Sequence, residues 1–154
     1  ERSFKMGTRC NIILKQGENL INIYRHWDGY LAVTGYDLTC RLQHSFSKNG
    51  FTKFDVFLKS ILGAKREANT LDIEKDLYEL TTGLHGDTEY LYKFEFFSDW
   101  DSKRVDVTIK KRYYGSQPNI SGWEDVAHEK VNQVTLWPKL NLISEAHLKY
   151  LKAA

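Results

Sequence analysis

The sequence predicts an α+β fold, in which an antiparallel sheet of two hairpins carries helices on one face. Two segments, 8–24 and 88–113, each contain two strand-length runs of alternating apolar and polar residues joined by a turn. Between them, residues 30–62 place apolar side chains at three- and four-residue spacing. Alternation is typical of half-buried strands, and the wider spacing of amphipathic helices. The expected order is therefore β-β-α-α-β-β, with the helices packed on one face of the sheet.

The first hairpin joins residues 10–15 to residues 20–24 through the turn Gln16-Gly17-Glu18-Asn19. Because side chains alternate along a strand, we expect Asn22, Tyr24 and His26 on the face that a ligand can reach. The opposite, buried face would then collect Cys10, Ile12, Leu14, Ile21 and Ile23. Asp28-Gly29 ends the second strand, since Gly accepts backbone angles that other residues avoid and Asp bonds to nearby amides.

The middle of the chain predicts three helices. The first covers residues 30–46 and stops at Asn49-Gly50, and the second begins at a capping box of Thr52 and Asp55. A polar loop over 63–70 follows. A brief third helix then carries Ile73, Leu77 and Leu80, and ends at Gly83.

The second hairpin pairs residues 88–97 with residues 104–113 across the turn SDWDSK. Its aromatic row, which we assign to the core face under the helices, consists of Tyr90, Tyr92, Phe94 and Phe96. Ser121 and Glu124 have the spacing of a capping box before a short helix, and Pro138 interrupts the chain. Ser144 is then expected to cap a last helix that carries Leu148 and Leu151.

Length and composition limit the class of protein. A chain of 154 residues predicts a single domain over 1–154, and we expect Met6 to be the natural first residue, with residues 1–5 left from cloning. A net charge of +2 does not favour nucleic acid by default, and no apolar run is long enough to span a membrane. Cys10 and Cys40 lack zinc or disulfide spacing, so two free thiols in a cytoplasmic protein are expected.

Two short polar motifs carry the candidate site. His26-Trp27-Asp28-Gly29 closes the second predicted strand, and His85-Gly86-Asp87 opens the third. If those two strands are antiparallel neighbours, the motifs meet at one edge of the sheet. Arg25 and the Trp27 ring would then add anion contact and stacking. The alternative interpretation is that each Asp and Gly shapes a turn and each His is an ordinary surface residue, because H-x-D spacing is common by chance.

Two further functions fit parts of the sequence. His26, Asp28, His85 and Asp87 include the ligand types of a divalent-metal site, and so of a metal-dependent phosphoester hydrolase. The run Lys110 to Tyr114 places cations beside aromatic rings, as in nucleic-acid binding, although lysines that protect a sheet edge from aggregation give the same pattern. No P-loop, dinucleotide, nucleophile-elbow or zinc-protease motif occurs, so no catalytic motif is complete and no cofactor is expected.

The segments Gly7-Thr8-Arg9-Cys10-Asn11-Ile12-Ile13 and Tyr24-Arg25-His26-Trp27-Asp28-Gly29-Tyr30 resemble those of a group of small bacterial and bacteriophage proteins. Members of that group begin near T-R-[SC]-x-I and carry an H-W-D-G-Y-P run, where this chain has Leu31 in place of proline. The group has no established activity. The resemblance implies a cytoplasmic bacterial or phage protein and directs attention to Arg9 together with the H-W-D-G motif. The function that we expect is a non-enzymatic binding module, which contacts a host protein or a nucleotide-like ligand through Arg9, Arg25, His26, Trp27, Asp28, His85 and Asp87.

Overall fold

The computed structural model describes residues 8–66, 75–97, 103–112 and 122–153, and its main feature is a six-stranded sheet. The strand order is β5-β2-β1-β6-β7-β8. The strands are β1 (Arg9–Gln16), β2 (Asn19–Arg25), β5 (Glu79–Thr81), β6 (Thr88–Phe96), β7 (Arg104–Arg112) and β8 (Trp123–Asn132). A separate ribbon pairs β3 (Lys65–Arg66) with β4 (Lys75–Asp76). The α+β class is therefore confirmed.

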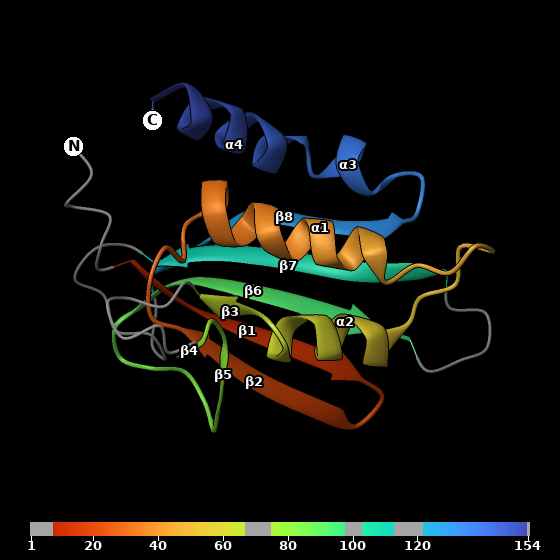
Figure 1. Cartoon of the computed structure of the whole chain (residues 1–154), viewed down its shortest axis with the longest axis horizontal. Coiled ribbons are helices and arrows are strands. Elements are labelled where there is room, and N and C mark those ends of the chain that lie inside the picture. Colours follow the sequence, from red (N-terminus) through yellow and green to blue (C-terminus); the bar gives the residue numbers. More distant parts are fainter. Residues whose placement is uncertain (1–7, 67–74, 98–102, 113–121, 154) are drawn as a thin grey trace.

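Helices α1 and α2 pack on one face of this sheet (Figure 1). The helical elements are η2 (Leu31–Gly35), α1 (Tyr36–His44), α2 (Phe54–Leu62), α3 (Leu136–Lys139) and α4 (Asn141–Ala153). η2 is one wide π turn that continues directly into α1, and the Tyr30 carbonyl accepts hydrogen bonds from three successive amides within it. The predicted first, second and last helices thus exist. Their predicted caps are wrong, because Lys53 rather than Thr52 is the N-cap of α2, and α4 begins at Asn141, which places Ser144 inside the helix. Within the described ranges, no helix has the length and apolar character needed to cross a membrane.

The sheet is mixed rather than antiparallel, which corrects the predicted topology. β1 pairs antiparallel with β2, but on its other side it pairs in parallel with β6, with Cys10 beside Tyr90 and Leu14 beside Phe94. The short strand β5 takes the free side of β2, so β2 and β6 are not neighbours. β1 is consequently an interior strand, and its apolar residues Cys10, Ile12 and Leu14 are fully buried.

The core lies between the helices and the predicted apolar face of the sheet. The register sets Ile12 opposite Ile23, so the first hairpin buries the face that alternation assigned to it. Phe57 of α2 packs against Phe94 and Phe96, with ring centroids 5.0 and 5.6 Å apart. The interpretation of the aromatic row as a core face is confirmed for its buried members, Tyr92, Phe94 and Phe96.

Two helix predictions are wrong, because tertiary pairing overrides local spacing. Leu77 and Leu80 lie in or beside strands rather than in a third helix; β5 pairs Leu80 with Ile23, while Ile73 lies outside the described residues. The segment after Glu124 is the long strand β8, which pairs with β7 along its length. Whether a segment forms a strand depends strongly on the strand beside it. Pairing with β7 therefore makes residues 123–132 a strand despite the capping-box spacing of Ser121 and Glu124.

A buried polar network joins the sheet to α1. Arg25 is only 6% exposed, and its Nη1 donates to the Tyr78 hydroxyl at 3.1 Å. That hydroxyl donates in turn to Asp37 at 2.6 Å, and Arg41 donates to the same carboxylate at 2.8 Å. Arg41 thus contacts the Asp37 carboxylate directly and Arg25 reaches it through Tyr78, so the buried Arg25 charge is linked to an anion, which lowers the cost of burying it.

The two cysteines are free thiols, as predicted. Cys10 lies in the core, where burial outweighs the nearby Arg25 charge and raises the pKa of its thiol to about 12. Cys40 on α1 is half-buried, and burial likewise raises its pKa. Both thiols therefore stay protonated at neutral pH.

Gly29 is needed where the chain after β2 passes over the start of β1. Its amide donates to the Thr8 carbonyl at 3.0 Å, and its own carbonyl accepts from the Tyr92 hydroxyl at 2.8 Å. A Cβ atom at this position would lie 2.8 Å from the Arg9 carbonyl carbon and 2.9 Å from Cys10 atoms. Backbone atoms cannot move aside, so a glycine is required here for space.

We predict that Gly29→Ala lowers the free energy of unfolding by about 1–3 kcal/mol, because the added methyl group overpacks a closed backbone contact. Gly86→Ala is the matched control, since nothing lies within 4 Å of a Cβ at that glycine. Its stability should stay within about 0.5 kcal/mol of the wild type. Urea denaturation of the three proteins measures both changes, and equal midpoints would contradict the close approach.

Candidate functional site

The candidate site lies at one end of the sheet, where β1 and β6 begin and β2 ends. We call it the rim cluster and define it as Arg9, Tyr24, His26, Trp27, His85 and Asp87. β1 runs antiparallel to β2 and parallel to β6, so it brings the end of one and the start of the other to the same edge. The two His-containing motifs therefore lie at the same edge, as predicted. They do so because β1 lies between β2 and β6 and pairs with both, and not because β2 and β6 are neighbours.

Arg9 is the central residue of the rim cluster. Its Nε lies 2.8 Å from Asp87 Oδ2, and its Nη2 lies 3.3 Å from His26 Nε2. Because a guanidinium only donates hydrogen bonds, this contact requires His26 Nε2 to be the unprotonated acceptor nitrogen. The guanidinium carbon also lies 5.7 Å from the centroid of the Trp27 ring, within cation–π range. The Arg9 guanidinium thus contacts the Asp87 carboxylate, the His26 imidazole and the Trp27 indole at the same time.

Tyr24 fixes the other side of the cluster. Its hydroxyl lies 3.0 and 3.1 Å from the two Asp87 oxygens, and its ring stacks on His85 at 3.7 Å between centroids. His26 meets the same ring edge-on at 6.1 Å. Burial, and then the hydrogen bond to Asp87, raise the pKa of Tyr24, so its hydroxyl remains a donor well above neutral pH.

Asn11 holds the segment before β6 in place, and sequence analysis did not single it out. Its side chain is fully buried, and Nδ2 donates to the carbonyls of Ile23 and Gly83, at 3.4 and 3.1 Å. Its Oδ1 accepts from the His85 amide at 3.1 Å and from the Thr88 hydroxyl. A polar residue inside the otherwise apolar run Cys10 to Leu14 was the available signal, because buried amides are retained where their hydrogen bonds are satisfied.

The seven predicted site residues do not share one role. Five belong to the rim cluster, where His26 is exposed, Trp27 is 38% exposed and the Asp87 side chain is 49% exposed. Arg25 lies on the helix-covered face instead, and its Nε donates to the Trp27 carbonyl at 2.7 Å. Asp28 has a φ of 58°, and its carbonyl accepts from Thr34 Oγ1 at 2.6 Å. Arg25 and Asp28 therefore shape the backbone that presents Trp27.

The rim cluster is not arranged as a metal centre. Among the described residues, no group of three or more His, Cys, Asp or Glu side chains is placed to hold a metal ion. All four members of the predicted quartet, His26, Asp28, His85 and Asp87, are among the described residues, and they do not form such a group. The Arg9 guanidinium lies against the Asp87 carboxylate, where a metal ion would need the same oxygens.

The three described cations of the basic run at the end of β7 each make a different contact. Lys110 pairs with Asp125 at 3.6 Å, whereas Lys111 lies over the Tyr90 ring at 5.8 Å. Arg112 donates to the Gly86 carbonyl at 3.1 Å and so adds a cation beside the rim cluster. Tyr113 and Tyr114 lie outside the described residues. The three described cations therefore do not form a single track for a polyanion.

Comparison of the chain with protein-family models, with curated proteins and with solved structures finds no match. Geometry is thus the basis for assigning a role to the rim cluster. Its composition of two aromatic rings, two imidazoles, an arginine and a carboxylate is suited to recognition. Trp, Tyr and Arg are the residue types that most often contribute the binding energy of interfaces.

We predict that Asn11→Leu lowers the free energy of unfolding by about 2–4 kcal/mol, because the Gly83 carbonyl and the His85 amide lose their partner in a buried place. Asn22→Leu, on the same face of the hairpin but only partly buried, is the matched control and should change it by less than about 0.5 kcal/mol. Denaturant unfolding gives both values. A mild effect of Asn11→Leu would mean that the loop before β6 does not depend on this amide.

We also predict that alkaline pH destabilises the protein. Burial raises the pKa of Tyr24, Tyr78 and Tyr92, so each folded phenol resists an ionisation that the unfolded chain undergoes near pH 10. The stability that they contribute is complete below about pH 10 and is lost as the pH rises further. Tyr24→Phe should therefore lose less stability than the wild type between pH 10 and 11.5, relative to each protein's value at pH 7. Parallel pH profiles would contradict this role of Tyr24.

Proposed function

We propose that the protein is a non-enzymatic binding module that docks a partner protein through the rim cluster. The observation that supports this proposal is the presentation of Trp27. Its indole ring is partly exposed, while Arg9 lies over it and is itself held by Asp87. An exposed tryptophan that neighbouring groups hold in one orientation is suited to insertion into a pocket of another molecule.

The network beneath the rim cluster reduces the cost of binding. Asn11 fixes the backbone of His85, Tyr24 holds Asp87, and the buried Arg25 holds the carbonyl of Trp27. Side chains that are already ordered lose little conformational entropy when a partner arrives. The rim cluster is therefore preorganised for recognition.

The exposed groups indicate the chemistry of the partner. Trp27 supplies an apolar anchor, and Leu84, which precedes His85, is also 39% exposed. Asp87 presents a half-exposed carboxylate beside them. The complementary surface would combine an apolar pocket with a hydrogen-bond donor or a cation at its margin.

The resemblance of the T-R-C-N-I and H-W-D-G-Y segments favours a cytoplasmic protein of a bacterium or its phage. For a phage protein, a protein of the bacterial host is the expected partner. A nucleotide-like ligand, with its base on Trp27 and its phosphates at Arg9, is the other occupant of the same site, and one experiment separates the two.

We predict that Trp27→Ala loses the partner. The wild type, Trp27→Ala and a control, Leu148→Ala, are immobilised and exposed to bacterial lysate, and retained proteins are quantified by mass spectrometry. Leu148 on α4 is 55% exposed and offers an apolar side chain away from the rim cluster. A true partner is retained by the wild type and the control, and its Kd for Trp27→Ala rises at least about tenfold in a purified titration, as for an interface hot spot.

Two results would contradict the proposal. Retention that is equal for all three proteins would show that the rim cluster is not the docking surface. Calorimetric titration with nucleotides that gives saturable binding, abolished by Trp27→Ala, would replace the partner protein with a small ligand.

A further inference from the structure

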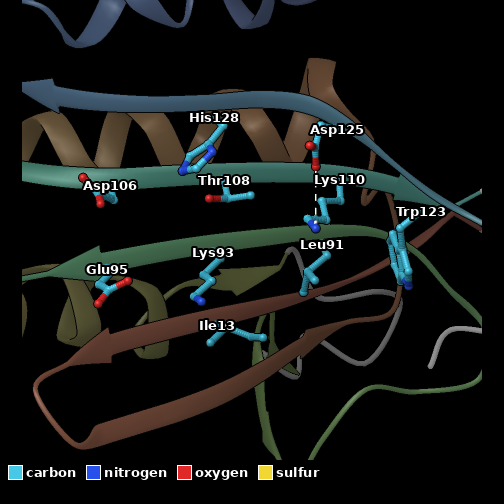
Figure 2. A pocket seen from close by; sticks show the side chains of 10 residues that line it. All are labelled: Ile13, Leu91, Lys93, Glu95, Asp106, Thr108, Lys110, Trp123, Asp125 and His128. Carbon is cyan, nitrogen blue, oxygen red and sulfur yellow. Dashed lines mark ion pairs between the residues drawn. The ribbon is translucent and has the colours of Figure 1, made fainter. Parts of the chain in front are cut away.

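The face of the sheet opposite α1 and α2 carries a hollow whose lining shares no residue with the rim cluster. There a cavity of about 470 Å³ opens over β1, β6, β7 and β8 (Figure 2). This volume falls within the range of small-molecule sites. Figure 2 shows Glu95 and Asp106 at one end of the cavity and Trp123 at the other, with the apolar side chains of Leu91 and Ile13 between them and below.

The strand register explains this division. Glu95 on β6 lies directly opposite Asp106 on β7, so two carboxylates share one row across the sheet. In the next row, Lys93 lies opposite Thr108, which lies opposite His128 on β8. The cavity thus has an acidic end, a cation beside it and an apolar end.

Two charged side chains of the cavity, Asp106 and Lys93, have incomplete pairing within the described part of the chain. Among the described residues, Asp106 Oδ1 is buried and accepts no hydrogen bond. Lys93 takes part in none of the ion pairs that the described residues form, whereas Lys110 is paired with Asp125 and Glu95 with Lys15. Lys93 and Asp106 are diagonal neighbours on adjacent strands, a relation in which side-chain attachment points lie roughly 7 Å apart. An acceptor and a cation therefore face one cavity without meeting each other.

We propose that this cavity binds a small zwitterion, namely a free α-amino acid with an apolar side chain. The ammonium group of the ligand donates to Asp106, its carboxylate accepts from Lys93, and its side chain lies over Ile13 and Leu91 toward Trp123. An α-amino acid carries both charges on one carbon atom, so it can bridge two groups that do not reach each other. Asp106 is only partly buried, so the accessible part of its carboxylate is the part that such a ligand would contact.

The charged residues of the lining disfavour the more common classes of ligand. Lys93 and Lys110 stand against Glu95, Asp106 and Asp125, which gives a formal charge of −1. A phosphate-rich ligand is disfavoured by that balance. A simple cation would leave Lys93 unpaired, and a simple acid would leave Asp106 unpaired, so a ligand with both charges fits best.

The test uses the full chain and L-phenylalanine and L-leucine as probes, with calorimetry for affinity and NMR shifts of the Ile13 and Leu91 methyl groups for location. Phenethylamine and 3-phenylpropionate are analogues that lack the carboxylate or the ammonium group. The variants are Asp106→Asn and Lys93→Met. The matched controls are Asp55→Asn and Lys59→Met on the exposed side of α2, which make the same chemical changes on the far face of the sheet.

At least one of the two amino acids should bind saturably and shift both methyl groups, with each analogue at least tenfold weaker. Asp106→Asn and Lys93→Met should each raise the Kd at least tenfold, and the controls should leave it unchanged. Circular dichroism of every variant confirms that the fold is retained. The proposal is overturned if neither amino acid saturates, if an analogue binds as tightly, or if the cavity variants bind like the wild type. None of these results depends on Trp27, so failure here leaves the proposal for the rim cluster untouched.

Discussion

The buried side-chain amide of Asn11 is the interaction on which the candidate site depends. It lies in the interior strand β1 and exchanges hydrogen bonds with β2, with the segment before β6 and with β6 itself. Few side chains can serve two donors and two acceptors at once, and an amide does so without bringing a charge into the core. The positions of His85 and Asp87 relative to His26 follow from this residue, because it joins the two pieces of chain that carry them.

The placement of β1 between an antiparallel and a parallel neighbour explains where the two proposed recognition surfaces lie. The ends of three strands converge at the rim, where they bring together Arg9, Tyr24 and Asp87. The same strands turn one face toward the helices and leave the other to carry the cavity around Lys93 and Asp106. The two surfaces share no residue: β1 contributes Arg9 to the rim cluster and Ile13 to the cavity, and the β6 residues Leu91, Lys93 and Glu95 line only the cavity.

Local patterns predicted the parts of the fold that local forces determine. Both hairpins and the helices α1, α2 and α4 follow from alternation, helical spacing and turn residues. The parallel pairing of β1 with β6 could not be predicted, since no feature of either strand specifies a distant partner. β5 and β8 were missed for the same reason: each is a strand because β2 or β7 offers it a free edge.

The candidate site was predicted in its location and less well in its details. Arg25 was predicted to contact a ligand because it lies beside His26, although its two-residue spacing from Ile21 and Ile23 is that of the covered face, where the structure has it. Conversely, alternation placed Asn11 on the open face, and only the fold reveals that the segment before β6 buries it there. Arg9 was selected through a resemblance, whereas its contacts with Asp87 and His26 depend on three-dimensional proximity.

The parallel pairing also affects the order in which the protein can assemble during synthesis. Cys10 pairs with Tyr90, so the two strands at the centre of the sheet are separated by 80 positions in the chain. At roughly 5–20 residues per second on the ribosome, the first hairpin waits several seconds before its long-range neighbour has been made. Contacts between distant residues also slow folding once the chain is complete. The hydrogen-bonding edge of β1 that β6 later pairs with therefore stays without this partner in the nascent chain until residues 88–96 have been made.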